Sequence, residues 1–506
     1  MTGLAQMLSG VWAVDPAADA IEFKHRWHTW GELAGIHAAI DALLQQAGLG
    51  AGARVGALLR NSPGMYATVQ SLCVAGRCMV TVNPLLPEDK LCADLRSLQV
   101  PALIAESADW ERPGLADTAH AIGAMAIALT GDPAVPARTL PGLERPACGL
   151  DRAYAPGIVF EMLTSGTTGT PKRVPLQASR FEKSMLDTLM YERDRKPDDP
   201  PRLRPGVQIL AQPFVHIGGL WGLFTVALAG RQACLLEKFN VDEWLDAVRR
   251  HRPKVSGGPP AALRMILDAN VPREDLSSLV ALRTGAAPLD PAVEDAFYER
   301  YGIAVLQNYA ATEFGTVGGW TLADYRAHRL DKRGSVGRIQ QGIEARIVDP
   351  ADGHELPPGE EGLLELRAPH IGDGRSWLRT TDRAALDADR FLWIRGRADN
   401  AIIRGGFKVH PDDVVKALEQ HPAIREAGVA GVPDPRLGQV PVAALVIEPG
   451  QSWPGEEAIG AFLRERLLPY QLPVRYKVVA ELPRTPSYKV SLPGVRELFA
   501  ADAGAQ

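Results

Sequence analysis

A nine-residue stretch, Thr164-Ser-Gly-Thr-Thr-Gly-Thr-Pro-Lys172, carries groups that suit the binding of a triphosphate. Its hydroxyls can donate hydrogen bonds to phosphate oxygens, and Lys172 adds a positive charge. Gly166 and Gly169 let the backbone turn and approach a ligand closely. The stretch lacks the Gly-x-x-x-x-Gly-Lys-Ser/Thr spacing of a Walker A loop. Because such clusters are also common in polar surface turns, this stretch alone leaves both interpretations open.

The residues before this loop predict the element that positions it. The short apolar run Ile158-Val-Phe-Glu-Met-Leu163 predicts a buried strand, so the loop follows a strand end, where α/β proteins place ligands. Strand and helix patterns then alternate through residues 205–310. We expect strands over 207–211, 232–236 and 279–284, and helices over 219–229, 241–248, 260–269 and 290–301. Repeated β–α units predict largely parallel sheets covered by helices.

A second, smaller unit is expected after Arg397, where the pattern restarts. A helix is predicted to begin at His410, another spans residues 459–467, and strands are predicted over 440–447 and 474–479. This tail has the size of a small α+β domain. The predicted fold is therefore α/β, with an N-terminal domain over 1–397 and a C-terminal domain over 398–506.

Composition excludes several classes of protein. The chain has 506 residues, of which 46% are hydrophobic and 23% charged, enough for a large core or more than one domain. Its net charge of −5 gives no indication of nucleic-acid binding. No secretory signal or transmembrane segment is predicted. The five cysteines are scattered, and no histidine cluster accompanies them. We therefore expect a reduced, soluble, cytoplasmic protein.

Four further motifs follow the first in sequence. They are Asn308-Tyr-Ala-Ala-Thr-Glu313, Thr380-Thr-Asp382, Gly396-Arg-Ala-Asp399 and Pro483-Arg-Thr-Pro-Ser-Tyr-Lys489. With the first stretch they resemble the motif series of the acyl-adenylate-forming superfamily, which includes acyl-CoA synthetases, adenylation domains of peptide synthetases and beetle luciferases. The resemblance covers nearly the whole chain from Pro16 and includes Asn61-Ser-Pro63 and Val82-Asn-Pro84. Five motifs in the same order are far more specific than one.

The resemblance implies two half-reactions in one site. A carboxylate attacks the α-phosphate of ATP and pyrophosphate leaves, after which a thiol takes the acyl group from the adenylate. It implies ATP, Mg²⁺ and CoA as cofactors and substrates, and a large N-terminal domain with a small mobile C-terminal one. The residues that it implies for ATP and AMP binding are Thr164, Ser165, Gly166, Thr167, Thr168, Gly169, Lys172, Gly285, Ala286, Ala287, Asn308, Tyr309, Ala310, Ala311, Asp382 and Arg397.

Four residues are expected to take part in the chemistry. By the resemblance, Lys489 bridges the carboxylate and the α-phosphate, and Thr312 contacts that phosphate. Glu313 is the expected Mg²⁺ ligand, since carboxylates beside bound phosphates commonly hold this ion. His216 resembles the gating histidine of acyl- and aryl-CoA ligases, with a core histidine as the alternative.

Three nucleotide contacts and two departures from the family pattern follow from the same motifs. Tyr309 is expected to stack on adenine, with a core position as the alternative. Asp382 is expected to accept hydrogen bonds from the ribose, and Arg397 to donate to ribose or phosphate, with a surface ion pair as the alternative. Thr381 and Tyr488 stand where the family usually has glycine. If Tyr488 strains its turn, the closed state is slower or altered.

The segment Pro213-Phe-Val-His-Ile-Gly-Gly219 bears on the acid. Amino-acid-activating relatives place an Asp in this region, so His216 among apolar neighbours disfavours amino acids. An apolar acyl pocket is expected from Phe214, Ile217, Trp221 and Val317, although aromatic groups of this kind are more often plain core. The bulk of Trp221 favours aryl or medium-chain acids over very long chains.

The second half-reaction is expected to need a rotation of the C-terminal domain. The resemblance implies that Gly405, Gly406 and Phe407 then line a tunnel for the thiol, with glycine permitting close approach of a pantetheine arm. The rotation would pivot at the hinge residue Asp399. A hairpin turn is the alternative interpretation of the two glycines.

The acceptor is not fixed by the sequence. CoA is the default, yet Gln471 and Val474 stand where the family often has basic residues, with Arg475 and Lys477 slightly later. An acyl carrier protein is therefore an alternative partner. A non-catalytic nucleotide-binding homologue and a luciferase-like monooxygenase are further alternatives, and a homodimer stays open.

Overall fold

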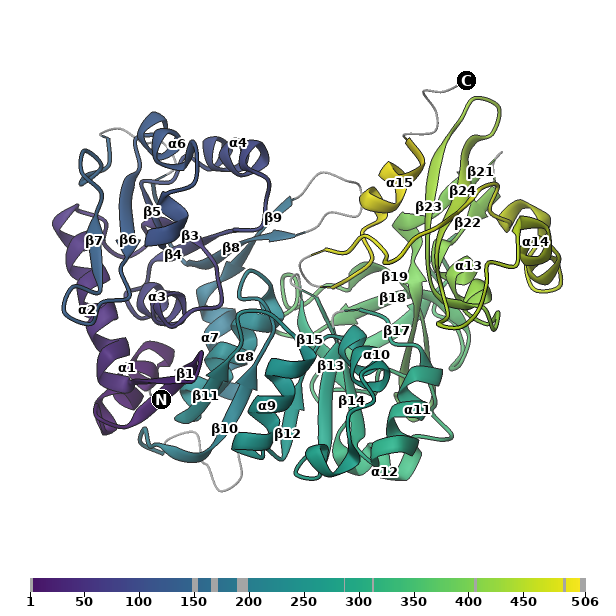
Figure 1. The fold of residues 1–506 in the computed structure, drawn as a ribbon, viewed down its shortest axis with the longest axis horizontal. Coiled ribbons are helices and arrows are strands. Elements are labelled where there is room, and N and C mark those ends of the chain that lie inside the picture. Colours follow the sequence, from purple (N-terminus) through teal and green to yellow (C-terminus); the bar gives the residue numbers. More distant parts are fainter. Residues whose placement is uncertain are drawn as a thin grey trace.

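The computed structural model describes residues 3–147, 153–164, 172–188, 199–285, 287–311, 314–404, 407–485 and 488–500. These residues form five β-sheets with helices packed around them. Figure 1 shows the N-terminal sheets at the left and bottom and the C-terminal lobe, in light green and yellow, at the upper right.

The largest sheet has seven strands, parallel at its centre and antiparallel at both edges. Its order is β7 (Ala137–Thr139), β6 (Met125–Leu129), β5 (Ala102–Glu106), β3 (Arg54–Leu58), β4 (Cys78–Val82), β8 (Ile158–Thr164) and β9 (Lys172–Gln177). Strands β3, β4 and β6 are buried at every residue, because their side chains alternate between cores on the two faces. Helices α1 (Leu4–Val14), α2 (Trp30–Gln46) and α3 (Pro63–Val74) contribute to one core; α4 (Glu88–Leu98) and α6 (Leu115–Ala121) contribute to the other, with α5 (Ser107–Trp110) beside them.

Two further sheets complete the β–α part of the N-terminal region. One has the order β10 (Arg204–Leu210), β11 (Arg231–Leu235), β1 (Asp19–Phe23) and β2 (Arg26–Thr29). The other has the order β12 (Val255–Gly257), β13 (Ala281–Gly285), β14 (Ala304–Ala311), β15 (Gly315–Gly319) and β16 (Arg338–Ile339). The helices of this region are α7 (Ala178–Thr188), α8 (Ile217–Leu228), α9 (Val241–His251), α10 (Pro260–Asp268), η2 (Arg273–Leu276), α11 (Pro291–Tyr301) and α12 (Leu322–His328). The predicted alternation over residues 205–310 is confirmed.

An antiparallel sheet leads into the C-terminal lobe. It runs in chain order through β17 (Glu344–Val348), β18 (Glu361–Arg367), β19 (Leu378–Leu386) and β20 (Leu392–Arg397), and the short helix η3 (Ala398–Asn400) follows. The sequence pattern did not predict this four-stranded meander. Arg397 is the last residue of β20. The domain boundary between residues 397 and 398 stays a prediction.

The C-terminal lobe has one sheet with a core on each face. Its order is β22 (Phe407–Val409), β21 (Ile402–Arg404), β24 (Gly438–Ile447) and β23 (Ile424–Asp434), and β25 (Tyr476–Val478) also pairs with β24. The helices are α13 (Pro411–Leu418), α14 (Glu456–Arg464), η4 (Pro469–Gln471) and α15 (Leu492–Ala500). The predicted α/β class, with a large N-terminal part and a small α+β C-terminal part, is confirmed.

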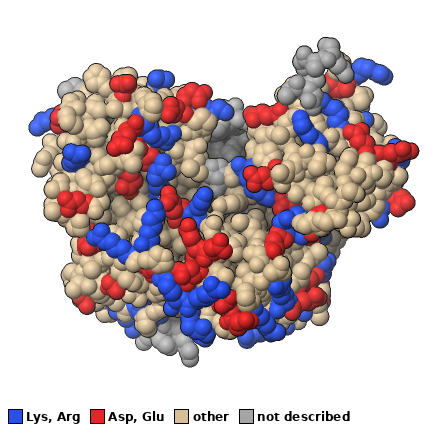
Figure 2. All heavy atoms as spheres, viewed as in Figure 1, with Lys and Arg blue, Asp and Glu red and all other residues tan. Residues whose placement is uncertain are grey.

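Two surface properties agree with the composition. On the face shown in Figure 2, basic and acidic side chains are interspersed over both lobes, and neither sign forms a continuous stripe. Within the described ranges, no helix has both the length and the apolar character needed to cross a membrane.

Candidate active site

Two of the predicted nucleotide contacts lie against each other. Tyr309, on β14, donates a hydrogen bond from its phenol to Oδ2 of Asp382, on β19. The Asp382 amide donates to the Thr380 hydroxyl over 3.1 Å, which fixes the start of this segment. Arg397, at the end of β20, is paired with Asp382 across the sheet. The fold thus brings three motifs together that are separated by up to 88 residues along the chain.

A second contact joins the expected adenine-lining turn to the Asn308 motif. Gly285 ends β13 and lies beside Asn308 in the neighbouring parallel strand β14. A Cβ atom at Gly285 would overlap the Asn308 side chain, so this close approach requires glycine. They form the last parallel pair of β13 and β14, on the carboxyl side of both strands, which is the usual side for a ligand in open α/β sheets.

His216 is a buried histidine at the start of α8. It occupies the N-cap position of that helix, and its Nε2 atom has no hydrogen-bond partner among the described residues. Burial, and then the positive charge of Lys489, lower the pKa of His216 to about 4. The imidazole is therefore neutral at physiological pH. Residue 489 acts on residue 216 although 273 positions separate them, because the C-terminal lobe folds back over the N-terminal part.

Asn61 positions the segment that carries His216. Its side-chain amide donates to the carbonyls of Gln212 (3.1 Å) and Leu236 (3.0 Å), and its Oδ1 accepts from the Phe214 amide (2.9 Å). Asn61 is buried, so these bonds are shielded from water. The sequence motif Asn61-Ser-Pro63 was noted but given no role. An asparagine side chain can form several hydrogen bonds, but the partners of Asn61 could be identified only from the tertiary structure.

Lys489 belongs to a tight turn before α15. The Thr485 amide donates to the Lys489 carbonyl over 2.8 Å, and the Lys489 amide donates to the Thr485 hydroxyl over 3.2 Å. In Figure 1 the yellow segment before α15 reaches from the C-terminal lobe towards the N-terminal part. The turn therefore presents Lys489 on the side of the N-terminal sheets.

The predicted hinge residue is hydrogen-bonded to a residue that is predicted to bind the nucleotide. Asp399, in η3, accepts hydrogen bonds from the Arg397 guanidinium over 3.0 and 2.9 Å. Arg397 also donates to the Thr381 hydroxyl over 2.5 Å, a bond that glycine at this position could not make. The sequence identified Thr381 as a departure from the family pattern, but its hydrogen bond to Arg397 could be seen only in the tertiary structure.

The four residues expected in the acyl pocket fall into two cores. Phe214 is fully buried in the core shared by the seven-stranded sheet and the sheet of β10, β11, β1 and β2, and Ile217 and Trp221 pack against that core. Trp221 meets Phe181 edge-on, with ring centroids 6.4 Å apart. Val317, also fully buried, lies in the separate core beneath the meander. The structure thus groups three of the four.

The expected thiol-tunnel face is turned to solvent in this structure. Phe407 is 57% exposed and stacks on Tyr470 of the same lobe, with ring centroids 4.7 Å apart and an interplanar angle of 17°. Arg404 donates to the carbonyls of Tyr470 (2.9 Å) and Leu472 (3.1 Å). These contacts hold the β21–β22 hairpin within the C-terminal lobe.

Several predicted site residues lie outside the described residues. They are Ser165, Gly166, Thr167, Thr168, Gly169, Ala286, Thr312, Glu313, Gly405 and Gly406, and the side chains of Thr164 and Lys172. The strands that flank them are described: β8 and β9 pair with Thr164 opposite Lys172, and β14 ends at Ala311. Ala287 and Ala310 are described; Ala287 comes two residues after Gly285 in sequence, and Ala310 follows Tyr309 on β14.

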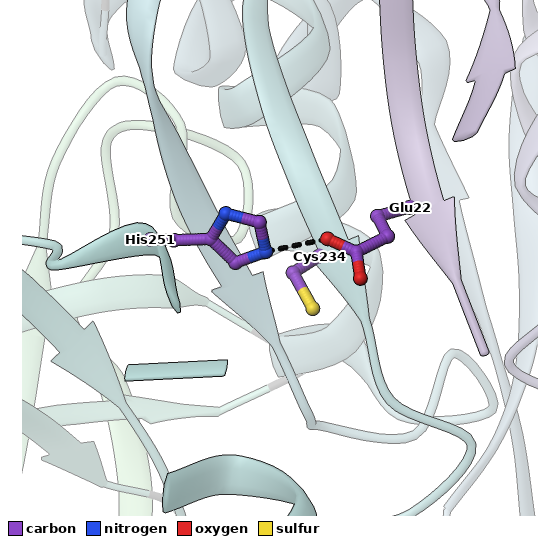
Figure 3. A group of neighbouring side chains, drawn as sticks. All are labelled: Glu22, Cys234 and His251. Atoms are coloured by element: carbon purple, nitrogen blue, oxygen red, sulfur yellow. Dashed lines mark ion pairs between the residues drawn. The ribbon is translucent and has the colours of Figure 1, made fainter. Parts of the chain in front are cut away.

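One group of potential metal ligands lies elsewhere in the described part of the chain. Glu22, Cys234 and His251 offer ligand atoms within 4.8 Å of one another, from β1, β11 and α9 (Figure 3). Glu22 and His251 form an ion pair of 2.5 Å, and Arg250 reaches both of them, at 2.5 Å from Glu22 and 3.1 Å from His251.

The chemistry of this group opposes a cation. Burial, and then the Glu22 carboxylate, raise the pKa of Cys234 to about 12, so the thiol is protonated at neutral pH. The Arg250 guanidinium already supplies the positive charge that balances Glu22. We therefore interpret the group as a charge-balanced buried network that joins α9 to the β1 sheet.

Comparison with known proteins places the chain in a family. The family model described as AMP-binding enzyme matches residues 10–374, and that described as AMP-binding enzyme C-terminal domain matches residues 414–489. The chain belongs to the AMP-binding enzymes. The acyl-adenylate resemblance predicted from the motifs is thereby confirmed.

Individual AMP-binding enzymes align along much of the chain. The 2-succinylbenzoate–CoA ligase of Bacillus velezensis is 32% identical over 67% of this chain and 68% of its own length. The indoleacetate–CoA ligase of Aromatoleum aromaticum is 29% identical over 96% of each chain. The solved structure of ATP-bound MatB from Rhodopseudomonas palustris shares the fold, with a TM-score of 0.80 over 98% of this chain and 99% of that one, at 24% identity.

Proposed function

We propose that this protein is an AMP-forming acid–thiol ligase that activates a carboxylic acid with ATP and passes the acyl group to a thiol. The observation that carries the proposal is that the charge of Lys489, from the C-terminal lobe, acts on the buried neutral His216 in the N-terminal part. The contact between Tyr309 and Asp382 supports a nucleotide site at the adjacent strand ends. Membership of the AMP-binding enzymes supports the class of reaction.

In the first half-reaction a carboxylate oxygen forms a bond to the α-phosphorus of ATP. The bond from that phosphorus to the bridging oxygen breaks, and pyrophosphate leaves with the electron pair. We assign to Lys489 the neutralisation of charge on the carboxylate and α-phosphate oxygens. His216, being neutral, borders the acid without adding a charge. Asp382 and Arg397 would hold the ribose.

Mg²⁺ suits the donor that follows β14. Glu313 comes two residues after the end of that strand in the sequence, and a carboxylate oxygen is the ligand type that Mg²⁺ prefers. When bound, the ion would neutralise phosphate charge. The chain's own part would then be to hold the nucleotide and exclude water.

In the second half-reaction the thiol sulfur bonds to the acyl carbon and the carbon–oxygen bond to AMP breaks. The thiol proton passes to solvent and AMP leaves with the electron pair. Phe407 faces solvent beside Tyr470, so this step requires the C-terminal lobe to turn about η3. We place the pivot at Asp399.

We propose an aryl or medium-chain acid as the substrate. Trp221, Phe181 and Phe214 contribute aromatic rings to the core from which α8 starts at His216, and we expect their bulk to disfavour a long chain. The names of the two relatives described above, which act on 2-succinylbenzoate and indoleacetate, support an aryl acid.

One observation favours a second acceptor. Lys477 donates to the Leu498 carbonyl over 2.8 Å and Arg475 to the Phe499 carbonyl over 3.5 Å, so both cations are engaged at the end of α15. Neither replaces the basic residues that the family often places near Gln471 for the phosphates of CoA. A carrier-protein phosphopantetheine, which needs only the thiol arm, is the second candidate.

The test is pyrophosphate release from ATP and Mg²⁺ with a panel of aryl and aliphatic acids of increasing length. Each acid is assayed alone, with CoA, and with a phosphopantetheine-loaded carrier protein, and Lys489→Ala is the matched inactive control. Release that depends on the acid and is accelerated by CoA supports the ligase. Acceleration only by the carrier protein supports the second acceptor. If a folded protein that binds ATP releases no pyrophosphate with any acid, alone or with either acceptor, the ligase proposal is rejected.

A further inference from the structure

Tyr488 adopts a backbone conformation that normally favours glycine. Its φ angle is +61°, in the left-handed region, and its amide donates to the Thr485 carbonyl over 2.8 Å. With the bond from the Thr485 amide to the Lys489 carbonyl, this closes a short turn whose last position must be left-handed. A side chain at such a position costs free energy. The protein therefore gains something from Tyr488 that glycine would not provide.

The side chain of Tyr488 is attached to the N-terminal part. Its ring packs against the core around Phe239, Trp244 and Ile266, which belongs to the region of α9 and α10. Its phenol donates to the Phe239 carbonyl over 3.1 Å. Burial raises the pKa of the Tyr488 phenol, which keeps the donating proton in place.

The other end of the turn is attached to the C-terminal lobe. Arg484 donates to the Tyr488 carbonyl over 3.0 Å and forms an ion pair with Glu426 on β23. A second ion pair crosses between the two parts nearby, from Arg425 on β23 to Asp268 at the end of α10. The turn that carries Lys489 thus bridges the two parts of the molecule.

We propose that Tyr488 is an interdomain latch, a positioning residue that holds the C-terminal lobe in the orientation in which the turn that carries Lys489 lies against the N-terminal part. Rotation of the lobe for the thiol step must break the bond to the Phe239 carbonyl and expose the ring of Tyr488. The latch therefore favours adenylation and slows the second half-reaction. The expected effect on the two half-reactions rests on the proposed function. The attachment of the turn to the N-terminal part does not rest on it.

Tyr488→Phe isolates the hydrogen bond, because it keeps the ring and the left-handed backbone. Tyr488→Gly removes the ring and the strain and restores the residue usual in the family. Tyr476→Phe is the matched control: Tyr476 lies on β25 in the same lobe, packs within that lobe's own core, and has no described contact with the N-terminal part.

Two readouts test the latch. Hydrogen exchange of the peptide covering residues 479–492, in ligand-free protein, should be about fivefold faster in Tyr488→Phe, the effect of one neutral hydrogen bond on an opening equilibrium. Single-turnover thioester formation from supplied acyl-adenylate should become about fivefold faster, while adenylation becomes slower. Tyr488→Gly should exceed Tyr488→Phe in both readouts, and Tyr476→Phe should match the wild type.

Opposite changes in the two half-reactions distinguish a latch from a structural role, which would slow both. The latch is overturned if Tyr488→Phe exchanges like Tyr476→Phe, or if both half-reactions fall together. Faster exchange in a protein that releases no pyrophosphate with any acid would keep the latch and reject the proposed function. Unchanged exchange in an active ligase would reject the latch alone.

Discussion

His216 should stay neutral across the physiological pH range. Its pKa of about 4, against an ordinary value of 6.5, arises first from burial and then from the charge of Lys489. The difference corresponds to about 3 kcal/mol for placing a proton on the imidazole. With a pKa of about 4, about one molecule in a thousand is protonated at pH 7. The rate of adenylation measured against pH should therefore have no inflexion near pH 6.5 that is due to His216. The wild type and His216→Gln should have profiles of the same shape in this range.

Lys489→Met separates the two causes of this shift. Removing the ammonium should raise the pKa of His216, but burial, the larger cause, should keep it below 6.5. Histidine-selective isotope labelling and NMR titration would measure both proteins, with His216→Gln assigning the resonance. His354 is an internal reference, because its hydrogen bond to Asp352 raises its pKa above the ordinary value.

The same difference has a consequence for stability with a defined sign. Because the folded pKa of His216 lies below the unfolded value, the folded protein resists protonation there. Its stability contribution is complete above pH 6.5 and is lost as the pH falls towards 4. A wild-type resonance for His216 that titrates at pH 6 or above, or one that does not move in Lys489→Met, would refute this account of the site.

Three further predictions concern other parts of the molecule. Lys489→Ala should lower single-turnover adenylation by about 100-fold or more and leave thioester formation from supplied acyl-adenylate within about twofold, since only the first step uses the lysine; equal losses in both steps would contradict its role. Gly396→Ala should destabilise the protein by about 2 kcal/mol in denaturant unfolding, because φ is +114° and a Cβ atom would overlap Asp412; Gly450→Ala, with φ of +84° but open space, should cost less. Burial raises the pKa of Glu294 to about 7, so its stability contribution is present below pH 4.5 and lost as the pH rises through 7; Glu294→Gln should raise the thermal midpoint at pH 8 but not at pH 4.5, and a shift that is equal at both pH values would be inconsistent with this cause.

The sequence predicted the β–α part of the fold because hydrophobic periodicity survives there as a local signal. The predicted strands over 207–211, 232–236 and 279–284 and the four predicted helices between 219 and 301 match observed elements, as do the predicted helices from His410 and over 459–467 and the predicted strands over 440–447 and 474–479. Strands β12, β14 and β23 and the final helix α15 were not predicted. The meander β17–β20 was not predicted, since register shifts in the β18–β19 and β19–β20 pairs interrupt the alternation of apolar and polar residues.

The motifs identified candidate residues, but their partners depended on the fold. Residue types and order alone indicated phosphate, metal and carboxylate chemistry, and the family followed from the order of five motifs. That Tyr309 meets Asp382, or that Asn61 holds the segment of His216, could not be predicted, because hydrogen-bond partners far apart in sequence are set by sheet order and register.

Tyr488 shows most clearly where the two sources of information divide. The sequence by itself determined the family, the class of chemistry and the presence of a bulky side chain where glycine is usual. It left open whether Tyr488 strains that turn, and the structure gives this residue a left-handed φ angle. Only the tertiary structure decided that the ring packs against the opposite part and that the phenol bonds to the Phe239 carbonyl. The reason is physical: backbone preference is a local property of a residue, whereas burial and hydrogen bonding depend on the surfaces that folding brings together.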